Sequence, residues 1–179
     1  MSTNIQIAIV GGGCFWCTET IFNAVQGVIE VISGYSGGTV PGHPTYREIT
    51  SGLTGHAEVV QISYDANTIS YKELLEIFMT THDPTTLNRQ GADVGTQYRS
   101  VIFYQTEQER EIAQTVLEHM QQLYDDRIHT ELTHFEKFYK ADDNHQDFYN
   151  RNKEQPYCTY VINPKLKTLK QLHANKLKS

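Results

Sequence analysis

Apolar positions along the chain recur with two periods, one typical of strands and one typical of helices. Alternating or continuous apolar runs predict strands over residues 5–10, 28–35, 58–64, 99–104 and 130–135. Helical spacing predicts helices over residues 14–25 and 71–79, from 106 to about 124, and over 142–150. Because strands alternate with helices, we predict an α/β sandwich, in which helices pack on one sheet.

Capping and charge patterns add detail to the helices and loops. Glu109 lies three residues after Thr106, which is the spacing of a capping box, so we expect Thr106 to begin a helix. Beyond Pro164, leucines share one face of a predicted helix, and the lysines of the other face are expected to be solvated. These lysines are Lys165, Lys167, Lys170, Lys176 and Lys178. Residues 33–46 and 82–96 are expected to be long loops.

Length and composition indicate one globular domain over residues 1–179, with a C-terminal segment from about 150 to 179 that is expected to be mobile. The formal net charge of −6 disfavours binding to nucleic acid. The first residues lack a cationic region, and the apolar run 5–10 is too short to cross a bilayer. We therefore expect a soluble, cytoplasmic protein without a membrane partner.

Candidate chemistry is concentrated at Cys14, which follows a strand and three glycines and begins a predicted helix. The unpaired N–H groups of a helix start carry a positive partial charge, which should lower the pKa of the thiol and favour a nucleophilic thiolate. A lone cysteine is more often a small buried apolar residue. The glycines and the second cysteine, Cys17, favour the nucleophile. Phe15 and Trp16 could form the wall of a pocket for a soft apolar group, although core packing explains Phe15 almost as well.

A Cys-x-x-Cys pair also fits two other kinds of protein. One is a thiol–disulfide oxidoreductase of the thioredoxin type, and the other is a zinc-binding module that uses Cys14, Cys17, Cys158 and a histidine. The fourth zinc ligand has no recognisable spacing, and no motif for NADPH or flavin is present. We therefore expect neither a metal nor a cofactor. His82, His134 and His145 are expected to be ordinary polar or packing residues.

The segment Gly13-Cys14-Phe15-Trp16 resembles the catalytic signature of the A-type peptide methionine sulfoxide reductases, the peptide-methionine (S)-S-oxide reductases. Similar segments follow in the family's order along nearly the whole chain, at residues 34–38, 44–48, 51–58, 93–100, 138–139 and 145–146. The ordered set is far more specific than any one segment. The chain departs from the family at Cys17, where glycine is common.

This resemblance implies an oxidoreductase that reduces methionine S-sulfoxide, free or in proteins, and so repairs oxidised proteins. The expected fold is α+β, a two-layer α/β sandwich with a mixed, largely antiparallel sheet, a ferredoxin-like core and long loops. The implied roles are Cys14 as nucleophile, Glu58 as general acid, Tyr46 and Tyr98 as hydrogen-bond donors to the sulfoxide oxygen, Asp93 as a polar residue near them, and Phe15 and Trp16 as the S-methyl pocket. Burial of Glu58 on its strand would raise the pKa of its carboxyl and keep it protonated.

Regeneration of Cys14 requires a second thiol, which would condense with the Cys14 sulfenic acid to form a disulfide. Cys17 lies one helical turn away. Cys158 lies in a region where members of the family often keep a mobile resolving cysteine. We favour Cys17, with Cys158 as the alternative or as the second thiol of a relay; a buried structural thiol remains an alternative for Cys158. The resemblance implies that thioredoxin then reduces the disulfide.

Overall fold

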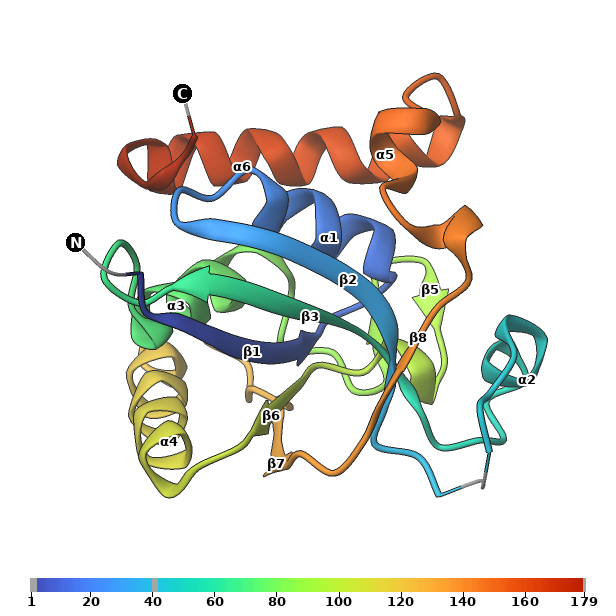
Figure 1. The fold of residues 1–179 in the computed structure, drawn as a ribbon, viewed down its shortest axis with the longest axis horizontal. Coiled ribbons are helices and arrows are strands. Elements are labelled where there is room, and N and C mark those ends of the chain that lie inside the picture. Colours follow the sequence, from blue (N-terminus) through green and yellow to red (C-terminus); the bar gives the residue numbers. More distant parts are fainter. Residues whose placement is uncertain (1–2, 40–41, 179) are drawn as a thin grey trace.

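A curled, mixed sheet lies at the centre of the molecule, and helices pack on it (Figure 1). The computed structural model describes residues 3–39 and 42–178, with strands β1 (Ile5–Gly11), β2 (Val28–Ser36), β3 (Ala57–Asp65), β4 (Arg89–Gln90), β5 (Asp93–Val94), β6 (Val101–Tyr104), β7 (Glu131–His134) and β8 (Phe138–Lys140). The large sheet has the order β7-β6-β1-β3-β2-β8, and β4 pairs with β5. Only β6 and β7 are parallel neighbours among these described strands. The expected fold of helices around a mixed sheet is confirmed.

The two faces of the sheet carry different apolar clusters, because successive side chains of a strand point to opposite faces. In β1, Ala8 and Val10 join the large core cluster, whereas Ile9 packs with Val59 and Phe103. The α-helices are α1 (Phe15–Asn23), α2 (Tyr46–Thr50), α3 (Tyr71–Thr81), α4 (Glu107–Gln121), α5 (Phe148–Arg151) and α6 (Asn163–His173). Helices α1 and α6 contact each other, and α3 contacts both α4 and α6. Within the described part of the chain, no helix is long and apolar enough to cross a membrane.

Side-chain hydrogen bonds cap the starts of α2, α3 and α4, and the cap of α4 differs from the predicted capping box. Thr106 does precede α4, and its hydroxyl accepts a hydrogen bond from the Glu109 backbone. The carboxylate of Glu109, however, accepts from the Gln105 backbone and not from Thr106, so the reciprocal half of the expected capping box is absent. Complete boxes begin α2, at Thr45, and α3, at Ser70.

The predicted helix over residues 142–150 is wrong. This segment forms a 3-10 turn, Asp143–His145, and then the short helix α5. Asp147 separates the two in the left-handed conformation, with a φ of 53°, which no continuous helix allows. The apolar pattern also did not predict α2, β8 or the β4–β5 hairpin inside the expected loop 82–96. Residues 40 and 41 of the expected loop 33–46 lie outside the described residues.

Two lysines of the expected solvated face of α6 and the turn after it have protein partners. Lys176 forms an ion pair with Glu73 of α3. Lys165 is half-buried and donates to the side chain of Gln90 at 3.2 Å. The leucine positions correctly predicted the helix. In its first turn, however, the charged side chain of Lys165 packs against the rest of the molecule.

The glycine turn before α1 is required by close packing. A Cβ atom at Gly12 would lie 2.8 Å from the ring of His82, and one at Gly13 would lie 2.7 Å from the side chain of Gln90. Gly13 also has a φ of +91°, which residues with a side chain rarely adopt. The chain can therefore pass from β1 into α1 within this turn, and Cys14 is brought to the start of the helix.

Candidate active site

Cys14 occupies the N-cap position of α1, in extended conformation, and its side chain does not cap the helix. A partner from a distant strand satisfies the first turn instead. The backbone N–H of Phe15 donates to Oε1 of Glu58, on β3, at 3.1 Å in a buried position. One hydrogen bond therefore joins the start of α1 to the sheet and holds the carboxyl group beside the cysteine.

The carboxyl group of Glu58 is almost completely removed from water, with only 1% of the residue exposed. Its second oxygen, Oε2, has no hydrogen-bond partner among the described residues. Burial raises the pKa of Glu58 to about 8, although the N–H group of Phe15 acts in the opposite direction. Glu58 is therefore mostly protonated at neutral pH and can donate a proton. The structure agrees with the expectation that burial raises the pKa of this group.

The thiol of Cys14 differs from expectation. Burial raises the pKa of Cys14 well above its ordinary value, and the negative charge of Glu58 adds to this rise. The backbone N–H of Trp16 lowers the pKa, as predicted for a helix start, but its effect is smaller. Desolvation therefore outweighs the helix start, and Cys14 is a neutral thiol at neutral pH.

Three tyrosines share the surroundings of this pair. Tyr46 begins α2, and Tyr98 ends the 3-10 turn Thr96–Tyr98. Tyr35 is paired with Glu58 across β2 and β3. In all three, burial is the main cause of a raised pKa and the Glu58 charge is the next, so the hydroxyl groups remain protonated donors. Tyr35 was not among the predicted site residues, although it lies in the segment 34–38 that resembles the family.

The Tyr35 hydroxyl is a second buried polar atom without a hydrogen-bond partner in the described part of the chain. Like Oε2 of Glu58, it lies in the neighbourhood of Cys14, since the charges of Glu58 and Cys14 both raise its pKa. A bound group with a hydrogen-bond acceptor would satisfy such a donor, and buried polar groups usually have partners. The site is therefore chemically suited to a ligand oxygen.

Aromatic rings surround the start of α1. The ring of Trp16 stacks on Phe148 at a centroid distance of 3.6 Å and meets the edge of Tyr157 at 5.6 Å. His145 stacks on Tyr46 at 4.3 Å and lies 5.6 Å from Phe15. Phe15 is buried in the main core, as the packing role predicts, while Trp16 is only half-buried. His145 is a packing residue, as expected, but it packs within this site.

The other two cysteines lie on the C-terminal side of the site. The Tyr157 hydroxyl donates to Oδ2 of Asp93 at 2.8 Å and lies 3.5 Å from Sγ of Cys17. Cys158, which follows Tyr157, is fully buried and shares an apolar cluster with Cys17. All three cysteines are free thiols. Tyr157 was not predicted as a site residue, although it is next to a candidate resolving cysteine.

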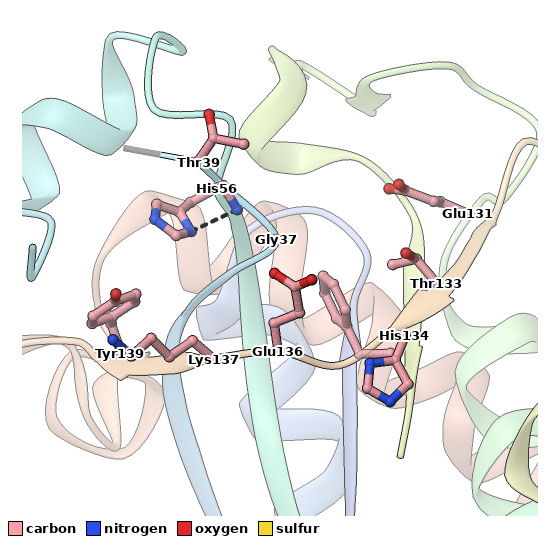
Figure 2. A pocket seen from close by; sticks show the side chains of 11 residues that line it. Gly37, Thr39, His56, Glu131, Thr133, His134, Glu136, Lys137 and Tyr139 are labelled. Carbon is pink, nitrogen blue, oxygen red and sulfur yellow. Dashed lines mark hydrogen bonds between the residues drawn. The ribbon is translucent and has the colours of Figure 1, made fainter. Parts of the chain in front are cut away.

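A hollow elsewhere in the molecule has a different character. Figure 2 shows this cavity of about 440 Å³, with Glu131, His134, Glu136 and Lys137 among its lining residues. It contains neither a cysteine nor any of the site residues predicted from the sequence. Within the described residues, no group of three or more histidine, cysteine, aspartate or glutamate side chains could hold a metal ion.

A cysteine thiol beside a buried, protonated acid is a nucleophile paired with a proton donor, which are the groups that a thiol-based oxidoreductase requires. The family model described as peptide methionine sulfoxide reductase matches residues 6–177. The chain is 53% identical over 174 residues to the peptide methionine sulfoxide reductase MsrA of Saccharolobus solfataricus, covering 97% of this chain and 98% of that protein. It is 48% identical to that of Thermus thermophilus over 161 residues, or 90% and 91% of the two chains.

Solved structures agree with this likeness. Reduced Mxr1 from Saccharomyces cerevisiae has a TM-score of 0.81 at 31% identity, with 86% of this chain and 89% of that chain covered. Methionine sulfoxide reductase A of Corynebacterium diphtheriae has a TM-score of 0.79 at 35% identity, with 83% and 76% covered. A further structure shows Mxr1 in complex with Trx2, at 22% identity and a TM-score of 0.57, with 83% and 89% covered. The chain belongs to the peptide methionine sulfoxide reductase family, and its activity is the thiol-dependent reduction of methionine sulfoxide to methionine.

The coupling of Cys14 to Glu58 predicts how alkylation of Cys14 depends on pH. In Glu58→Gln, no negative charge can form beside the thiol, so the pKa of Cys14 should fall and its reaction with iodoacetamide should be faster above about pH 8. We expect the midpoint of the rate profile to move down by about one pH unit. Serine at positions 17 and 158, in both proteins compared, ensures that the label reports Cys14 alone. An unchanged or higher midpoint would show that Glu58 does not act on the thiol.

Proposed function

We propose that Cys14 attacks the sulfur of methionine sulfoxide while Glu58 protonates the oxygen. A sulfoxide sulfur becomes electrophilic only when its oxygen is protonated or strongly hydrogen-bonded. The observation that carries this proposal is the buried, protonated carboxyl of Glu58, whose Oε2 has no partner among the described residues, beside the Cys14 thiol. Tyr46 and Tyr98 donate hydrogen bonds to the same oxygen, and Phe15 and Trp16 enclose the S-methyl group.

Glu58 and Cys14 are both protonated at the start of this step, and this determines which protons move. Glu58 gives its proton to the sulfoxide oxygen, and the Cys14 thiol loses its own proton as its sulfur bonds to the sulfoxide sulfur. The hydroxyl group then moves from the methionine sulfur to the Cys14 sulfur. The S–S bond and the S–O bond to methionine break, an S–O bond to Cys14 forms, methionine leaves, and Cys14 carries a sulfenic acid. The thiol proton returns the carboxylate to its protonated form, so thiol and sulfoxide give sulfenic acid and methionine without a net change of charge. We assign the S epimer as the substrate, as the resemblance to the A type implies.

The proposed regeneration of Cys14 uses the thiol of Cys17 first and that of Cys158 second. We propose that Cys17 condenses with the sulfenic acid, forming a Cys14–Cys17 disulfide and water. Cys158 shares the apolar cluster of Cys17, so the disulfide can pass to a Cys17–Cys158 pair by thiol–disulfide exchange. A thioredoxin-like protein is the proposed final reductant, and the complex of Mxr1 with Trx2 supports this choice. The thiols supply both electrons, so the scheme includes no resident cofactor.

We also propose that the chain forms a single domain with a ferredoxin-like core. The elements β1, α1, β2, β3, α3 and β6 follow one another with intervening segments, and the four strands have the order β6-β1-β3-β2. This succession supports the expected two-layer sandwich, in which α1 and α3 cover one face. Strands β7 and β8 extend the sheet at its two edges.

Single-turnover release of methionine tests the catalytic assignment. With no external reductant, Cys14→Ser should release no methionine from the S-sulfoxide, because it lacks the attacking thiol. Glu58→Gln should bind the substrate but release methionine about 10²-fold more slowly, the scale of a lost general acid. Leu53→Ala changes an exposed side chain and is the control expected to match wild type. Wild-type rates in Glu58→Gln across neutral pH would remove Glu58 from the mechanism.

Peptide mapping tests the route of regeneration. After one equivalent of sulfoxide, the first disulfide detected should join Cys14 and Cys17, because the two residues are within one helical turn. Cycling with thioredoxin should fall far more in Cys17→Ser than in Cys158→Ser. A bridge between Cys17 and Cys158 that appears later would identify the relay. A dominant first bridge from Cys14 to Cys158, with normal cycling in Cys17→Ser, would contradict the proposed route.

A further inference from the structure

A small space lies beside Cys17, and a lysine from α6 forms part of its wall. Cys17, Thr18, His82 and Lys165 are among the residues that line it. Its volume of about 10 Å³ is at the lower limit for one water molecule, so it cannot hold a ligand. Lys165 and Cys17 thus line the same narrow space, so the positive charge of Lys165 acts on the neighbourhood of Cys17.

The position of Lys165 is fixed by a chain of contacts that leads back to the glycine turn. Its ammonium group donates to Oε1 of Gln90 at 3.2 Å. Gln90 also exchanges two hydrogen bonds with the backbone of Asp83, at 2.8 and 2.9 Å, and its side chain packs against Gly13. The next lysine of α6, Lys167, is exposed. Lys165 is thus held next to α1, whereas its neighbour faces solvent.

The groups around Cys17 differ in their effect on a thiolate there. Burial raises the pKa of Cys17, and the carboxylate of Asp93 and the thiol of Cys158 add to this rise. Lys165 is the largest opposing influence, followed by the Tyr157 hydroxyl. Three further titratable groups lie near Cys17, namely His82, Asp83 and Cys14.

One of these is His82, in which burial lowers the pKa to about 4, so that the ring is neutral at pH 7. The Cys14 thiol is neutral as well, and Asp83 lies next to His82 on the loop that Gln90 holds. Neither the histidine nor the Cys14 thiol offers a positive charge to Cys17. Among these groups, Lys165 is therefore the one whose positive charge acts on the Cys17 sulfur.

We propose that Lys165 is a positioning residue for the resolving step, in which its charge favours the thiolate of Cys17. This inference rests on the proposed function of Cys17. In the step, the Cys17 thiolate attacks the sulfur of the Cys14 sulfenic acid, a new S–S bond forms, and the S–O bond breaks. Hydroxide leaves and takes up the proton that Cys17 lost, giving water. The sulfenic sulfur is reduced and the Cys17 sulfur is oxidised, so no outside oxidant is required.

The test measures the rate of disulfide formation against pH in full-length protein that carries Cys158→Ser. Lys165→Met should move the midpoint of this profile up by about one pH unit, the usual scale for a cation beside a thiol. At pH 7 the rate should fall by roughly threefold, because the tenfold smaller thiolate fraction is partly offset by the greater nucleophilicity of a more basic thiolate. Above the new midpoint the variant should equal or exceed the parent, so the two profiles cross.

Controls distinguish charge from packing. Lys165→Arg should keep the parental midpoint, and Lys167→Met, which removes an exposed lysine from the same helix, should not change it. Lys165→Gln, a second neutral variant, should shift the midpoint as Lys165→Met does. Equal profiles in Lys165→Met and the parent, or a uniform fall at every pH, would overturn the role of Lys165 while the Cys14–Cys17 bridge still forms. Failure of the parent to form that bridge after normal methionine release would instead overturn the role of Cys17, and the inference with it.

Discussion

The hydrogen bond from the Phe15 backbone to Glu58 is the interaction on which the site depends. The first N–H groups of a helix lack partners within the helix and usually bond to the N-cap side chain. In α1 the N-cap residue is Cys14, which makes no such bond, and the carboxyl group of a strand residue replaces it. The same hydrogen bond therefore caps the helix and places an acid beside the thiol.

The same burial determines the protonation state of both groups. Two acids that share a dry pocket cannot both ionise without a large electrostatic cost, and burial raises the pKa of Cys14 and of Glu58. The resting site thus keeps a neutral thiol and a protonated acid, and a free thiolate would be more easily oxidised by other reagents. A sulfoxide oxygen that accepts hydrogen bonds from Glu58 and the tyrosines would allow the two protons to move together with the attack on sulfur.

Sequence patterns predicted the features that depend on neighbouring residues. The order of strand, glycine turn, cysteine and helix follows from local periodicity, and the ordered segments resembling the family indicated the activity. Patterns within one segment could not show that the rings of Phe148 and Tyr157 approach Trp16, or that Lys165 reaches Gln90, because these contacts join residues far apart in the chain. The pKa of Cys14 was predicted in the wrong direction for a related reason. The effect of a helix start is visible in the sequence, whereas the larger cost of burial depends on the packing of the whole molecule.

The central claim is that Glu58 is protonated beside a neutral thiol at neutral pH. The infrared difference spectrum between wild type and Glu58→Gln tests it directly, because a protonated carboxyl group and a carboxylate absorb at different frequencies. At pH 7 the account predicts a carbonyl band of a protonated carboxyl group that is present in wild type and absent from the variant. This band should give way to carboxylate absorption as the pH rises through about 8. A carboxylate band at pH 7, without the protonated form, would contradict the account.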